Sequence, residues 1–205
     1  GEIVILAGVE NVEIGDTICS RDNPQPLRRI AVDEPTISMT FGVNSSPFCG
    51  RDGTFVQSRK IIERLEKECL HNVALGLEAK PYQEFFTLLG RGEFQMAILI
   101  ETMRREGYEF SVGRPTVLLR TNEQGQTTES IEHVYIDCGE DFTGIVTEKL
   151  SLRKGRLVNL INRGTGRVRL EFTVPTRGLI GYRCEFLTDT RGTGIISSYL
   201  SGYEV

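Results

Sequence analysis

The 205-residue sequence is poor in the side chains that build most catalytic and metal sites. It contains two histidines, His71 and His133, so neither a catalytic triad nor a zinc site is favoured. Its five cysteines are odd in number, widely scattered and never arranged as C-x-x-C, which indicates reduced thiols and not a disulfide framework. These shortages argue against an enzyme that works in a cleft of this chain.

Long apolar runs and nucleotide-binding motifs are missing as well. No stretch approaches the roughly 18 consecutive apolar residues of a membrane span, and no basic-then-apolar leader is visible, so we expect a cytoplasmic protein with no membrane partner. The phosphate-binding pattern G-x-x-x-x-G-K-S/T is absent, and neither Gly90-x-Gly92 nor Gly164-x-Gly166 completes a dinucleotide fingerprint. We therefore expect no catalytic residue, no metal ligand and no cofactor in this chain.

Charge is present in quantity but unevenly placed, which the net charge of −4 conceals. Residues 122–148 contain seven acidic side chains and neither lysine nor arginine, whereas residues 149–191 contain ten basic side chains and three acidic ones. A local excess of positive charge is typical of a surface that binds nucleic acid. The alternative is that the two blocks neutralise each other across one small sheet.

The first 27 residues have the pattern of strands but too little chain to enclose a core. Apolar runs at 3–7 and 9–14 are separated by Gly8 and followed by Gly15, as in the closing strands of a β-barrel. Because so short a segment cannot bury a core alone, we expect the rest of the barrel to be missing. The start inside an apparent strand, without methionine, also suggests a fragment.

Strand and helix patterns then alternate twice in the same order. In the first unit, strands are predicted at 36–43, 73–78, 85–89 and 110–120, with helices at 54–70, begun by a Thr54–Gln57 capping box, and at 93–106. In the second, strands are predicted at 131–138, 157–161, 168–174 and 195–200, with helices at 142–152 and 180–189. The order βαββαβ is the ferredoxin-like arrangement, so the predicted fold class is α+β with two tandem ferredoxin-like units behind the last strands of a barrel.

An equivalent junction marks both units. Gly90-Arg91-Gly92 and Thr176-Arg177-Gly178 each join the third strand to the second helix, 86 residues apart. This spacing matches the length of one unit and supports the repeat. We expect glycine at these junctions because the backbone geometry there requires it.

The basic half of the second unit supplies candidate contacts to RNA. Arg163, Arg167 and Arg169 flank a glycine turn, where long cationic side chains can reach phosphates. Aromatic residues are sparse, so we expect recognition of backbone or shape and not base stacking. The full set of candidate RNA contacts is Arg153, Lys154, Arg163, Arg167, Arg169, Arg177 and Arg183.

The loop at 44–53 is the most distinctive feature of the first unit outside its core. An exposed aromatic residue in a loop often marks an interface, so we expect Pro47 and Phe48 to contact a neighbouring domain. We count Arg51 and Arg59 among the candidate interdomain contacts, and their side chains could also face phosphates. The alternative is that these two residues only solubilise the loop and the helix that follows it.

Several motifs in these units are distinctive in sequence. They are Val43-Asn44-Ser45-Ser46-Pro47-Phe48-Cys49-Gly50-Arg51-Asp52-Gly53, Leu89-Gly90-Arg91-Gly92-Glu93 with Met103-Arg104-Arg105-Glu106-Gly107, and Gly166-Arg167-Val168-Arg169 with Pro175-Thr176-Arg177-Gly178-Leu179-Ile180-Gly181-Tyr182-Arg183. In this order and at these separations they closely resemble the BipA/TypA family of bacterial translational GTPases. The resemblance extends over essentially the whole chain.

The resemblance implies a division into three parts. Residues 1–27 resemble the C-terminal part of the second, β-barrel domain of a translational GTPase. Residues 28–115 are similar to the third domain of elongation factor G, and residues 116–205 to its fifth. The G domain and the C-terminal domain of the family are absent from the sequence, so no GTPase residue is carried over, and these domains are expected partners within the same protein.

For the parent protein, the resemblance implies ribosome-stimulated GTP hydrolysis with GTP and magnesium, and a role in large-subunit assembly and stress adaptation. Expected partners are rRNA and ribosomal proteins near the factor-binding region of the large subunit, bound by a cytoplasmic, ribosome-associated monomer. The first unit would then relay the state of the G domain. The alternative is a regulatory small-molecule-binding module, since tandem ferredoxin-like units also serve as ligand sensors.

Overall fold

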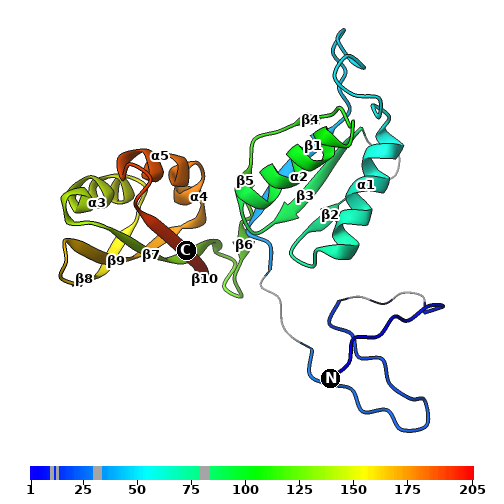
Figure 1. The fold of residues 1–205 in the computed structure, drawn as a ribbon, viewed down its shortest axis with the longest axis horizontal. Coiled ribbons are helices and arrows are strands. Elements are labelled where there is room, and N and C mark those ends of the chain that lie inside the picture. The colour runs from blue at the N-terminus through cyan, green and yellow to red at the C-terminus, as the bar shows by residue number, and fades with distance from the viewer. Residues whose placement is uncertain (10–11, 13, 30–33, 79–83) are drawn as a thin grey trace.

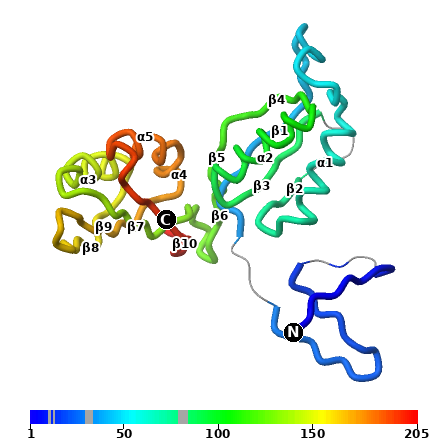
Figure 2. Tube along the Cα trace, viewed as in Figure 1, coloured from blue at the N-terminus to red at the C-terminus, as the bar shows by residue number. Residues whose placement is uncertain are grey.

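Two antiparallel sheets, one after the other along the chain, organise the computed structural model of the protein (Figure 1). The structure describes residues 1–205 except 10–11, 13, 30–33 and 79–83. Helices cover one face of each sheet, and the chain passes from the first sheet to the second between β5 (Thr116–Val117) and β6 (Arg120–Thr121) (Figure 2). None of the helices in the described part of the chain is long and apolar enough to cross a membrane.

The first unit has the strand order β2-β3-β1-β4, with β5 also paired with β1. All of these pairings are antiparallel, which is the arrangement of a βαββαβ unit whose last strand is split in two. Its elements are β1 (Ile37–Gly42), α1 (Ser58–His71), β2 (Gly76–Glu78), β3 (Phe85–Gly90), α2 (Glu93–Arg105), β4 (Ser111–Val112) and β5 (Thr116–Val117).

The second unit repeats this order as β10-β7-β9-β8, and β6 adds a short hairpin to β7. The predicted α+β fold with two ferredoxin-like repeats is therefore confirmed, and both sheets are open. Its elements are β6 (Arg120–Thr121), β7 (Thr127–Gly139), η1 (Glu140–Phe142), α3 (Thr143–Leu152), β8 (Arg156–Asn162), β9 (Arg167–Pro175), α4 (Thr176–Leu179), α5 (Tyr182–Asp189) and β10 (Ile195–Glu204).

Each unit has its own hydrophobic core, built from the apolar residues that the period-two pattern predicts. In β1 the side chains of Ile37, Met39 and Phe41 are buried against α1 and α2. In β9 the same alternation buries four residues under α3 and α5: Val168, Leu170, Phe172 and Val174. Alternate residues of β7 and β9 therefore face away from the helices, and this uncovered face presents the charged residues discussed below.

Two local predictions are wrong. Helix α1 begins at Ser58 with no side-chain cap from Gln57, because the N–H groups of Thr54 and Phe55 donate to the carbonyl of Gly107. The helix predicted at 180–189 forms as α5 but begins only at Tyr182, because Gly181 before it has a φ of +72° in the left-handed region, and the short helix α4 that precedes Gly181 was not predicted.

The strands predicted in the first 27 residues are not formed within the described part of that segment. Ile3 and Ile5 are almost completely exposed. A strand needs a neighbour for its N–H and C=O groups and a surface for its apolar side chains, and this segment meets neither requirement here. The strand predicted at 9–14 lies partly on residues outside those described.

Candidate nucleic-acid interface

The seven predicted RNA contacts lie in three separate places. β8 and β9 are antiparallel neighbours, so Arg163, Arg167 and Arg169 meet at the hairpin that joins these strands. We call these three residues the hairpin cluster. Lys154 and Arg177 lie at the opposite end of the same two strands. Arg153 and Arg183 lie on the helix-covered side, where Arg153 donates to the carbonyl of Gly178 and Arg183 of α5 donates to that of Ile196 in β10.

The hairpin cluster surrounds one carboxylate. Asp137 of β7 is directly opposite Arg169 of β9, whose guanidinium donates to both carboxylate oxygens, with Nη2 to Oδ2 at 2.6 Å. Arg163 Nε lies 3.8 Å from Oδ1, and Arg167 donates to the backbone carbonyl of Asp137. The side-chain hydrogen bond from Arg169, with smaller Coulombic contributions from all three arginines, lowers the pKa of Asp137. Three cations thus gather around Asp137, and a second carboxylate, that of Glu140, lies beside the turn, where it accepts from Asn162 Nδ2 at 3.5 Å.

The turn of this hairpin holds its basic residues out toward solvent. Gly164, Thr165 and Gly166 all have φ between +60° and +72°, and Asn162 Oδ1 accepts the Gly164 N–H at 2.9 Å. Arg163 is half-exposed and has the weakest internal pairing of the three arginines. Arg163 is therefore the residue of the hairpin cluster best placed to meet an external phosphate.

At the opposite end of β8 and β9, residues of the basic block form ion pairs with acidic residues. Arg177 donates through Nε to Glu129 Oε2 at 2.6 Å, and this hydrogen bond raises the pKa of Arg177. Arg156 is paired with Glu204. Lys154 is exposed beside them, with φ of +68°. This end of the sheet is close to neutral, so the alternative interpretation of the charge blocks holds here.

The side chain of Arg153 makes its hydrogen bonds within the second unit. Its guanidinium donates to the carbonyls of Gly178 and Ile180 at 3.0 and 3.1 Å and to Glu185 Oε2 at 2.9 Å, and it lies over the ring of Tyr182. These bonds tie α3 to the break between α4 and α5. The guanidinium therefore serves as a structural link, which the charge pattern alone does not distinguish from an RNA contact.

Replacing Arg153 with glutamine is expected to lower the free energy of unfolding of the second unit by about 2 kcal/mol, because several charge-assisted hydrogen bonds are lost together. Urea unfolding measures the change. Lys154→Gln, a neighbouring charge loss without these bonds, is the control and should change stability by less than about 0.5 kcal/mol. Equal stability of the two variants would contradict the structural role.

The loop at 44–53 is organised by a residue that the sequence interpretation missed, Glu109. Its Oε1 accepts from Asn44 Nδ2 at 2.7 Å, and its two oxygens together accept the backbone N–H groups of Gly50, Asp52 and Gly53 at 2.9 to 3.1 Å. Glu109 is buried, and these hydrogen bonds, led by that from Gly50, lower its pKa. A single carboxylate thus fixes both sides of the loop.

The fixed loop presents an aromatic and cationic tip. Phe48 is exposed, and the guanidinium of Arg51 lies 4.6 Å from the centre of its ring. Pro47 is exposed next to it. Arg59 lies outside this tip and pairs with Glu63 on α1 at 2.8 Å. The structure therefore brings together three of the four predicted interdomain residues and leaves Arg59 on the helix surface.

An aromatic cluster on the uncovered face of the second sheet was also missed. The ring centres of His133 and Tyr135 are 4.8 Å apart, and His133 stacks with Tyr199 at 5.5 Å. Arg169 lies 5.9 Å from Tyr135, so the cluster continues into the hairpin cluster. The available signal was the alternation of His133 and Tyr135 with the buried Val134 and Ile136, which places both on one face.

Comparison with known proteins agrees with this architecture. Residues 126–205 match the family described as elongation factor G C-terminus, so the second unit belongs to the class of elongation-factor domains. Over 204 residues the chain is 48% identical to the large ribosomal subunit assembly factor BipA of Escherichia coli K12 and of Haemophilus influenzae, and 46% identical to that of Bacillus subtilis. Over its whole length the chain is therefore similar to BipA proteins. The chain spans 33% of the length of each of these relatives.

Proposed function

We propose that this chain is the ribosome-docking region of a BipA-type translational GTPase and acts in assembly of the large ribosomal subunit. The observation that carries the proposal is the hairpin cluster at an exposed turn, in which Arg163 and Arg169 pair with the carboxylate of Asp137 and Arg167 donates to its backbone carbonyl. Such a turn suits rRNA phosphates, because long cationic side chains release counterions when they bind them. The partners are rRNA and adjacent ribosomal proteins of the large subunit, met by a monomer in the cytoplasm.

GTP and magnesium belong to the parent protein in this proposal. The chain has no phosphate-binding loop, and within the described residues no three side chains of the metal-binding types converge. In this proposal GTP is hydrolysed outside this chain. The chain's own residues bind the ribosome and position the protein on it. The tip formed by Pro47, Phe48 and Arg51, held by Glu109, is the contact through which the first unit meets the G domain and relays its state.

Replacing Arg163 with glutamine is expected to weaken binding of the protein to purified large subunits and to reduce the slope of log K against log salt concentration by about one. Co-sedimentation at several salt concentrations gives both quantities. Arg105→Gln removes an arginine from α2 that is more exposed than Arg163 and pairs with Glu101, and it should leave the slope unchanged. The same slope for wild type and Arg163→Gln would contradict the assignment.

A further inference from the structure

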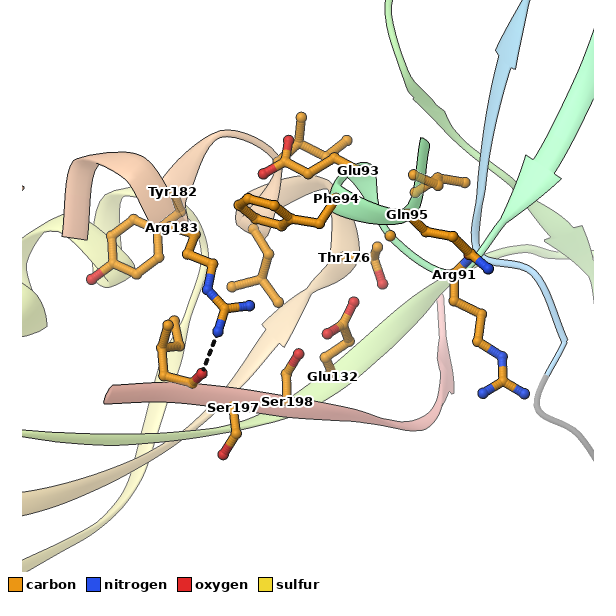
Figure 3. Close-up of a pocket in the computed structure, with 15 residues that line it drawn as sticks. Arg91, Glu93, Phe94, Gln95, Glu132, Thr176, Tyr182, Arg183, Ser197 and Ser198 are labelled. Atoms are coloured by element: carbon orange, nitrogen blue, oxygen red, sulfur yellow. Dashed lines mark hydrogen bonds between the residues drawn. The ribbon is translucent and has the colours of Figure 1, made fainter. Parts of the chain in front are cut away.

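A cavity of about 290 Å³ lies between the two units (Figure 3). The equivalent junctions of the two repeats face each other across it: residues 91–95 follow β3, and residues 176–183 follow β9. The end of β1 and the strands β7 and β10 close the remaining sides. A cavity at the interface of two units is the usual place for a small-molecule site.

Direct contacts between the units hold the two walls together. Glu93, the first residue of α2, accepts the N–H of Gly181 with both carboxylate oxygens at 2.9 and 3.0 Å. The guanidinium of Arg183 lies 5.3 Å from the centre of the Phe94 ring. The shape of the cavity is therefore fixed by residues of the junctions themselves.

The cavity contains a carboxylate with no partner among the described residues, that of Glu132. In β7 this residue lies in register with Leu200 and Val174 and, by alternation, on the helix-covered face with Val134. Figure 3 shows its carboxylate directed into the cavity near Thr176 and Ser198. A carboxylate beside apolar walls is costly to desolvate unless a cation pairs with it, so Glu132 favours a ligand that carries an ammonium group.

Arg183 supplies the opposite charge along the cavity wall. One terminal nitrogen, Nη2, donates to the carbonyl of Ile196 at 3.1 Å, which anchors the guanidinium beside β10 (Figure 3). A guanidinium has five N–H donors, so it retains the capacity to bind a carboxylate. A cation site and an anion site in one small cavity are complementary to a zwitterion.

The lining also has an apolar part, beside polar residues such as Gln95, Thr176 and Ser198. Leu179, Ile180 and Ile196 contribute aliphatic surface, and Phe94 and Tyr182 contribute rings. The hydroxyl of Tyr182 points away from the cavity in Figure 3, so only its ring takes part. Aliphatic walls around a volume of this size suit a short branched side chain.

We propose that this cavity binds an α-amino acid with a branched aliphatic side chain, its ammonium at Glu132 and its carboxylate at Arg183. Because both junctions line the cavity, the ligand stabilises the orientation in which the two units now lie. The proposal adds a ligand site to the protein and does not rest on ribosome docking.

The test is calorimetric titration of the full chain with L-leucine. We expect saturable binding to the wild type and on the order of tenfold or weaker binding to Glu132→Gln and to Arg183→Gln. Glu148→Gln, an exposed acid on α3, is the matched control and should bind as the wild type does. Circular dichroism establishes that each variant is folded.

Two analogues separate the two charged contacts. 3-Methylbutylamine lacks the carboxylate of leucine, and 4-methylpentanoate lacks its ammonium group, so both should bind on the order of tenfold more weakly than leucine. The amine should lose affinity in Glu132→Gln but not in Arg183→Gln, and the acid should show the reverse. Absence of saturable leucine binding to the wild type, or undiminished binding to Glu132→Gln, would overturn the proposal.

Discussion

Replacing Gly178 with alanine is expected to lower the free energy of unfolding of the second unit by about 3 kcal/mol, because the added methyl group has no space. A Cβ atom at this position would lie 2.5 Å from the carbonyl oxygen of Arg153 and 3.1 Å from Val174 Cγ1. The first neighbour is backbone and cannot rotate away. Either α3 or α4 must shift, and the hydrogen bonds from the Arg153 side chain to Gly178 and Ile180 are lost with that shift.

The matched control is Gly144→Ala in α3. Nothing lies within 4 Å of a Cβ atom built at Gly144, so this change should stabilise the helix by up to about 1 kcal/mol. Urea unfolding followed by circular dichroism measures both variants. The two changes are chemically identical, so the opposite signs isolate the close approach at Gly178. A Gly178→Ala variant as stable as the wild type would contradict this packing.

Replacing Glu109 with glutamine is expected to release the loop at 44–53, and with it the tip formed by Pro47, Phe48 and Arg51. A glutamine side chain keeps the shape but replaces one acceptor oxygen with an NH₂ group. That group would face the donors from Asn44 and Gly50 in one orientation, or those from Gly50, Asp52 and Gly53 in the other. Amide hydrogen exchange of Gly50, Asp52 and Gly53 should become faster by on the order of tenfold or more.

The control for this change is Glu66→Gln, an exposed acid on α1 in the same unit, which should leave exchange in the loop unaltered. The pH dependence gives an independent check. Hydrogen bonds to its carboxylate lower the pKa of Glu109 in the folded protein. The loop is therefore held fully above the ordinary glutamate pKa of about 4.3 and is released only as pH falls through the lower folded value. Unchanged exchange in Glu109→Gln would show that the loop does not depend on the carboxylate.

The fold could be predicted because its signals are local. The alternation from Val168 to Val174 requires only that one face of a strand be buried, and the repeated βαββαβ order then restricts the sheet to few arrangements. Pairing across long distances has no such local signal. The burial of Glu109 under a loop more than 50 residues away depends on backbone N–H groups, which every sequence contains.

The candidate site could be predicted only in part for the same reason. Charge patterning located the basic half, but Arg153 and Arg163 look alike in sequence and differ in the structure by which acceptors surround them. Gly178 was expected to serve backbone geometry, yet its φ is not in the left-handed region and the structure requires glycine there for close packing against Arg153. Glu132 lies within the acidic block, and only the register of β7 places it in the cavity between the units.

The most direct test of ribosome docking by the hairpin cluster is a titration of the unaltered protein with purified large subunits at rising salt concentration. Docking through the hairpin cluster predicts saturable binding at low salt, with a binding constant whose logarithm falls linearly with the logarithm of salt concentration, as phosphate contacts require. Arg163→Gln is predicted to give a shallower line in the same titration. Absence of binding at low salt, or binding that does not change with salt, would contradict the account.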